Sequence, residues 1–163
     1  MWTTFAGAAG GAAAGLTGLT FIVVAVRYDT LAVSEEYRNR AAQTISLYLT
    51  ITVAAILITV PQPVQALGIE MMVIAVLSGL LLTSLDSRAR RHQTRPVNRA
   101  LVIGLSAFVA TVLASGLTLA LGHDWGLFFF VASAALALVV GVTGAWTFLT
   151  RAGMDEPPKQ TSP

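Results

Sequence analysis

The chain has 163 residues, of which 55% are hydrophobic and only 11% charged, with a formal net charge of +2. A soluble domain averages about 25% charged residues, so ten basic and eight acidic side chains are too few to cover a water-facing surface. This composition excludes a disordered chain, a nucleic-acid-binding module and almost any soluble enzyme. The chain has no cysteine, which excludes disulfides and thiolate metal sites, and we expect no cofactor and no metal centre.

Five apolar stretches follow one another along the chain, and each is long enough to cross a bilayer. A spanning helix needs about 20 predominantly apolar residues. We therefore predict an all-α integral membrane protein, a bundle of five transmembrane helices over residues 1–151. A flexible cytoplasmic tail is expected over residues 152–163. The predicted spans are residues 3–26, 41–60, 64–85, 100–122 and 125–150.

Short breaks separate two pairs of spans. Pro61-Gln62-Pro63 can be a kink, a re-entrant tip or a turn, and we favour a turn because each flanking arm is long enough to span. Gly122-His123-Asp124 predicts a second turn, in which Asp124 can cap the last helix. Ser34 followed by Glu35 and Glu36 predicts that the second helix begins near residue 35. Spans joined by such short turns must be antiparallel neighbours.

Positive charge predicts the orientation of the bundle. Lysine and arginine accumulate in cytoplasmic segments near span ends. With the N-terminus outside and the C-terminus in the cytoplasm, all ten basic residues fall on the cytoplasmic side, and the outer turns hold none. Aromatic rings agree, because Trp2, Phe5, Trp125 and Phe128 then form an outer belt. The basic residues are Arg27, Arg38, Arg40, Arg88, Arg90, Arg91, Arg95, Arg99, Arg151 and Lys159.

Small residues at four-residue spacing mark two helix faces. In lipid, helices associate through close approach and van der Waals contact, which small residues permit. We therefore expect the first and last spans to make the tightest helix contacts, within the monomer or across an oligomer interface. The ridge in the first span is Gly7, Gly11 and Gly15, and the ridge in the last span is Ser133, Ala137, Gly141 and Ala145.

Three segments carry a resemblance to a known group of proteins. They are the run from Ala12 to Phe21, the pair Arg40-Ala41, and Leu67-Gly68-Ile69-Glu70. In these segments the chain resembles small polytopic proteins of the bacterial inner membrane. The resemblance covers about the first half of the chain. It implies a five-span membrane protein in the bacterial inner membrane, and it assigns no catalytic residue.

One carboxylate lies inside a predicted span. Glu70 is six residues past the outer turn, hence about 9 Å deep at 1.5 Å per residue. Ionisable groups at membrane depth are costly and often functional, so Glu70 is a candidate proton or cation site. With His123 and Asp124 it can form a small cluster of groups that bind divalent cations. The alternative places Glu70 in headgroup water beside Gln62 or Gln65.

Arginines are densest in the link after the third span. Arg88, Arg90, Arg91, Arg95 and Arg99 are candidates for contact with anionic lipid headgroups or a partner protein. The alternative is that they only anchor the topology.

Two functions from different classes remain open. The first is a non-catalytic scaffold, accessory or regulatory subunit that self-associates or joins another membrane protein. The second is an oligomeric channel or transporter subunit with a polar path near Glu70, lined by hydroxyl side chains. An enzyme is not expected, because no constellation of catalytic side chains lies at one depth. Hydroxyls that can line such a path are Thr17, Thr20, Ser46, Thr50, Thr52, Ser78, Thr111, Ser115 and Ser133.

Overall fold

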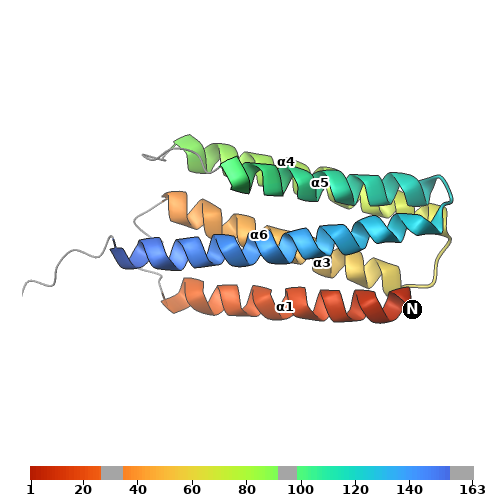
Figure 1. The fold of residues 1–163 in the computed structure, drawn as a ribbon, viewed down its shortest axis with the longest axis horizontal. Coiled ribbons are helices and arrows are strands. Elements are labelled where there is room, and N and C mark those ends of the chain that lie inside the picture. The colour runs from red at the N-terminus through yellow and green to blue at the C-terminus, as the bar shows by residue number, and fades with distance from the viewer. Residues whose placement is uncertain (27–34, 92–98, 155–163) are drawn as a thin grey trace, which may run out of the picture.

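A computed structural model describes residues 1–26, 35–91 and 99–154, and these residues form five long helices and no strand. The all-helical prediction is confirmed for these residues, and each of the five helices is long and apolar enough to cross a membrane. Figure 1 shows the helices side by side along one axis in alternating directions. The helices are α1 (Trp2–Val26), α3 (Glu35–Thr59), α4 (Val64–Arg91), α5 (Arg99–Ala120) and α6 (Leu127–Met154).

The helix bounds refine the predicted spans. Helix α3 spans Glu35–Thr59, and the predicted cap by Ser34 lies outside the described residues. Helix α4 continues beyond residue 85 to Arg91, and α6 continues to Met154, into the segment predicted as a flexible tail. Helical backbone continues into polar sequence because nothing in those residues interrupts it, whereas the prediction ended each span at the first charge.

The two predicted turns lie at one end of the bundle, here called the turn end. Residues 61–63 separate α3 from α4 without helical structure, so the turn interpretation of the two prolines is confirmed. Gly122 has φ +84°, a conformation that glycine adopts without strain, and it ends α5. The Gly122 N–H donates to Leu119 O at 2.8 Å and the His123 N–H to Thr118 O at 3.1 Å, which together form a Schellman motif.

Helix α3 lies at the centre of the bundle and contacts α1, α4 and α6. Half of the residues in its most apolar 18-residue stretch are buried, against 11% for α1. In Figure 1, α1 lies along one edge of the bundle, and α4 and α5 lie together on the opposite side. The opposite end from the turns, here called the arginine end, carries Arg40, Arg88 and Arg99.

Candidate functional site

Glu70 lies in the first two turns of α4, half-buried beside the turn that precedes it. Gln62 Nε2 donates to Glu70 Oε2 at 2.8 Å and also to Leu57 O at 3.3 Å. This side chain therefore ties the last turn of α3 to α4. The geometry agrees with the alternative that placed Glu70 beside Gln62, and it gives the carboxylate a structural partner.

His123 and Asp124 lie in the turn between α5 and α6, and both are exposed. Asp124 is the first residue of a short 3₁₀ helix, η1 (Asp124–Gly126), and His123 occupies the capping position without a side-chain bond. The expected cap by Asp124 is therefore wrong, because a turn of 3₁₀ helix, of which Asp124 is the first residue, precedes α6. The His123 ring packs edge-on near Trp125, with centroids 6.2 Å apart.

The sequence allowed Glu70, His123 and Asp124 to form one cation-binding cluster. Among the residues that the structure describes, no group of three or more His, Asp or Glu side chains is placed to hold a metal ion. Glu70 instead bonds to Gln62. The cluster is therefore not formed, because a shared end of the bundle does not bring side chains of different helices together.

The ridge on α6 is mostly buried inside the bundle. Ser133 and Ala137 are fully buried, Gly141 is buried and Ala145 is half-buried. A Cβ built on Gly141 would lie 2.6 Å from Cε1 of Tyr48, so the missing side chain makes room for this ring. At Gly141, the absence of a side chain thus permits the close contact of α6 with α3.

The ridge on α1 is open. A Cβ built on Gly7, Gly11 or Gly15 would meet nothing within 4 Å, and all three are exposed. The three glycines of this ridge make no helix contact within the monomer, so for α1 the prediction now depends on an oligomer interface. Helix α1 packs chiefly on α3, and it meets α6 at the turn end, where Trp2 and Phe128 stack edge to face at 4.9 Å.

A different set of small residues fixes α1 to α3. Ala6, Gly10 and Ala13 are the buried residues of α1. A Cβ on Gly10 would lie 2.7 Å from the Cβ of Ala55, so the two backbones approach closely there. These three residues also lie on one helix face, four and three residues apart. The sequence prediction chose the repeat of three glycines instead, because glycine permits the closest approach of two helices.

The arginine end holds a cross-helix ion pair that the sequence did not indicate. Arg40 Nη1 of α3 lies 3.0 Å from Asp86 Oδ1 of α4, with 17% and 14% of the two side chains exposed. Arg40 also donates to Gln43 Oε1 at 3.2 Å. Two residues 46 positions apart, each at the edge of an apolar stretch, gave no sequence signal for a pairing.

The arginine cluster is described only in part. Arg88 and Arg99 are exposed. Arg90 and Arg91 belong to α4, but their side chains lie outside the described part of the chain, as does all of Arg95.

Hydroxyl side chains along the spans bond to their own helices. Nine hydroxyls were predicted to be able to line a polar path, and all except that of Ser115 donate to carbonyls three or four residues earlier. For example, Thr50 Oγ1 donates to Ser46 O at 2.7 Å, and Ser133 Oγ donates to Phe130 O at 2.8 Å. Ser115 is fully buried, and its Oγ has no hydrogen-bond partner among the described residues. The eight other predicted hydroxyls therefore bond to the backbone of their own helices and do not form a chain between helices.

Comparison with known proteins adds no relative: no protein-family model, curated protein or solved structure matches this chain.

Proposed function

We propose that this chain is a non-catalytic multi-pass protein of the bacterial inner membrane, with its N-terminus outside and its arginine end in the cytoplasm. It acts as a scaffold, accessory or regulatory subunit that self-associates. Five apolar helices support the membrane location. The orientation is supported by the basic residues, all of which belong to segments on one side of the predicted spans.

The open glycine face of α1 is the observation that carries this proposal. Gly7, Gly11 and Gly15 present bare backbone on a helix at the edge of the bundle, and nothing within 4 Å occupies the space of their missing side chains. Two such faces can approach closely, and close approach is the main source of helix association in lipid. A second copy of α1 offers a matching surface, so a symmetric dimer is the simplest assembly.

The channel or transporter alternative has less support. It requires polar groups that face a common path, whereas the hydroxyls predicted to line it, except that of Ser115, are bonded to carbonyls of their own helices. Glu70, the carboxylate around which such a path was expected, accepts a hydrogen bond from Gln62 beside the turn. These contacts support a structural role for the polar side chains of the spans.

The proposal is tested by adding bulk to the open face. Gly11→Leu should lower self-association, because the side chain holds two backbones apart, and it should leave the melting temperature unchanged. Mass photometry in nanodiscs and cross-linking in native membranes measure the association. Gly10→Leu, one residue away, should lower the melting temperature because its Cβ meets Ala55 at 2.7 Å.

A matched control adds the same bulk elsewhere. Ala135 is exposed on α6, and Ala135→Leu should associate as wild type does. The proposal is wrong if the wild-type chain is monomeric in membranes, or if Gly11→Leu associates as strongly as wild type and Ala135→Leu.

A further inference from the structure

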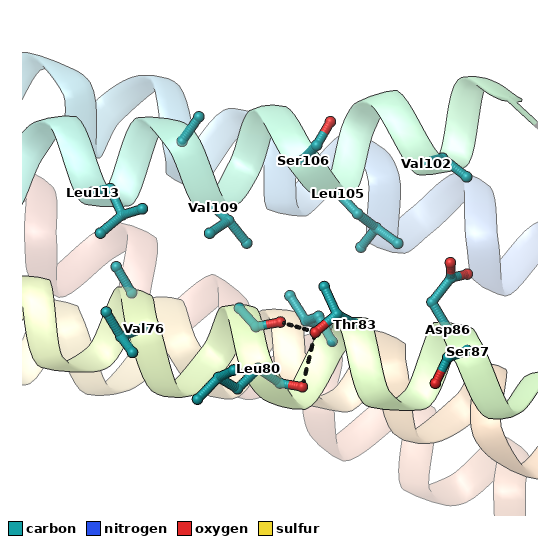
Figure 2. Close-up of a pocket in the computed structure, with 14 residues that line it drawn as sticks. Val76, Leu80, Thr83, Asp86, Ser87, Val102, Leu105, Ser106, Val109 and Leu113 are labelled. Atoms are coloured by element: carbon teal, nitrogen blue, oxygen red, sulfur yellow. Dashed lines mark hydrogen bonds between the residues drawn. The ribbon is translucent and has the colours of Figure 1, made fainter.

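A groove runs between α4 and α5 on the face of the bundle away from α1. Its volume is about 660 Å³. Figure 2 shows Asp86 and Ser87 at one end of the groove and Val76 and Leu113 at the other, with the two helices as its walls. The groove therefore occupies the half of this helix pair nearer the arginine end.

Small residues explain why the groove opens only in this half. Near the turn end the two backbones touch: a Cβ on Gly116 would lie 2.7 Å from Met72 N, and one on Gly68 would overlap the backbone at Ala120. Further along, a Cβ on Gly79 would meet only the side chain of Val109, at 3.1 Å. The helices are thus spaced by side chains there instead of by backbone contact.

Most residues that line the groove are apolar, and the three hydroxyls among them are bonded to backbone carbonyls of their own helices. Thr83 Oγ1 donates to carbonyls of its own helix at 2.8 and 3.0 Å, as the dashed lines in Figure 2 show. Ser106 and Ser87 also donate to their own helices, at 2.9 and 2.8 Å. Ordered water needs two to four polar partners, whereas these walls offer mainly carbon atoms, so the chemistry favours a hydrocarbon occupant.

The length of the groove matches one leaflet of a bilayer. From Ala75 to Ser87 the α4 wall spans twelve helical steps, or about 18 Å. One leaflet contributes about 15 Å of hydrocarbon. An acyl chain that runs along the groove would therefore begin near mid-membrane and end at the headgroup level, beside Ser87.

The charge at the mouth of the groove favours an anionic headgroup. The carboxylate of Asp86 is matched by Arg40 at 3.0 Å. Arg99 is exposed and lies three, seven and ten residues before the groove-lining Val102, Ser106 and Val109, hence on the same face of α5. Its guanidinium is thus available to a phosphate at the mouth.

We propose that this groove binds one acyl chain of an anionic phospholipid from the leaflet at the arginine end, with the lipid phosphate held by Arg99. The proposal rests on the proposed membrane location. A second copy of the chain fits less well, because the rim carries Val76, Leu80 and Leu113, whose branched side chains hold another helix away. An acyl chain is thin enough to pass between them.

Native mass spectrometry of the full chain in mild detergent tests the proposal, with dioleoylphosphatidylglycerol and dioleoylphosphatidylcholine titrated separately. Wild type should retain phosphatidylglycerol more tightly. Ala110→Phe fills the groove from an exposed lining position and should abolish this retention, as should Thr83→Phe on the opposite wall. Ala135→Phe adds the same ring on an exposed face of α6 and should bind as wild type does.

A second pair of variants tests the headgroup contact. Arg99→Gln should weaken phosphatidylglycerol binding about fivefold and phosphatidylcholine binding less, because the choline cation already offsets the charge of its phosphate. Arg38 is the control: it is exposed on α3, which does not line the groove, and it pairs with Glu35 at 3.2 Å. Arg38→Gln should retain wild-type binding.

The outcomes separate this proposal from the proposed function. Equal retention of the two lipids by wild type, or unchanged retention in both Ala110→Phe and Thr83→Phe, overturns the groove proposal alone. A change of oligomeric mass in those variants in place of lipid loss shows that a second copy occupies the groove, which also overturns it. Extraction of the protein from membranes by alkaline carbonate overturns the membrane location, and the groove proposal with it.

Discussion

Gly141 lies where α6 crosses Tyr48 of α3, and a methyl group at this position has no room. A Cβ there would lie 2.5 Å from Cζ and 2.6 Å from Cε1 of the ring. Tyr48 is 1% exposed, so the ring has no open space into which it can turn. Three residues later, a Cβ on Gly144 would lie 3.6 Å from Thr44 Oγ1, an ordinary contact. The two glycines therefore form a matched pair on one helix.

The expected magnitudes follow from two terms. Gly141→Ala should lose about 1–3 kcal/mol of unfolding free energy to overpacking and regain about 1 kcal/mol from the higher helix propensity of alanine. Gly144→Ala gains the same propensity term without the clash, so it should stabilise the protein by up to about 1 kcal/mol. Because propensity is common to both variants, the difference between them reports packing alone, about 1–3 kcal/mol.

Reversible unfolding in mixed micelles, followed by circular dichroism, measures both variants under identical conditions. Tyr48→Phe removes the phenolic oxygen, the atom nearest to the Gly141 position, and should recover part of the loss when combined with Gly141→Ala. Equal stability of Gly141→Ala and Gly144→Ala would refute this packing account, because it would mean that α3 and α6 do not meet as the structure has them.

Three further predictions address topology and polar contacts. A cysteine at His123 should react with an impermeant maleimide in intact cells and one at Gln93 only after permeabilisation; the reverse pattern contradicts the N-outside orientation. Removing either side chain of the Arg40–Asp86 pair should lower the unfolding free energy by about 1–3 kcal/mol, between the values for surface and buried pairs, because the two side chains are 17% and 14% exposed. The double variant should lose less than the sum of the two single variants. Glu70→Gln should leave the melting temperature unchanged, because an amide oxygen still accepts the bond from Gln62. Glu70→Leu removes this bond and should cost about 1 kcal/mol of unfolding free energy. If divalent cations raise the melting temperature of wild type but not of Glu70→Gln, Glu70 is a cation site instead.

The sequence predicted the helices and turns well because these depend on local chemistry. Long apolar stretches predict the spans, and proline or glycine predicts the turns, as Gly122 does through its positive φ. Errors at helix ends have one cause. A charged residue such as Asp86 ends a hydrophobic stretch without ending a helix, so α4 runs on to Arg91.

The sequence could not assign partners to the faces that it identified. Both small-residue ridges have the same four-residue spacing, yet the Gly141 ridge is buried against Tyr48 and the Gly11 ridge is open. In a soluble protein the polar face of a helix distinguishes outside from inside. In α1 both faces are apolar, so periodicity shows that a face can pack and does not show on what.

The ion pair at the arginine end escaped prediction for a related reason. Arg40 and Asp86 each lie at the end of a predicted span. A charged residue at this position is expected to be solvated, and this expectation names no partner for it. Their pairing depends on the rotation of α3 and α4 about their axes. Buried contacts such as that of Gly141 with Tyr48 set how the central helix α3 is rotated in the bundle, and no local pattern encodes that contact.

The two open faces of the bundle have different shapes, and this difference predicts that they act independently. The α1 face is bare glycine backbone on one edge, suited to a second helix, whereas the α4–α5 groove is a narrow channel between branched side chains. The described residues that form the two faces lie on different helices, so changes in one should not alter the other. Gly11→Leu should therefore lose self-association and keep phosphatidylglycerol, and Ala110→Phe should do the reverse. Loss of both properties in either single variant would mean that lipid binding and association share one surface, and the assignment of separate occupants would then be wrong.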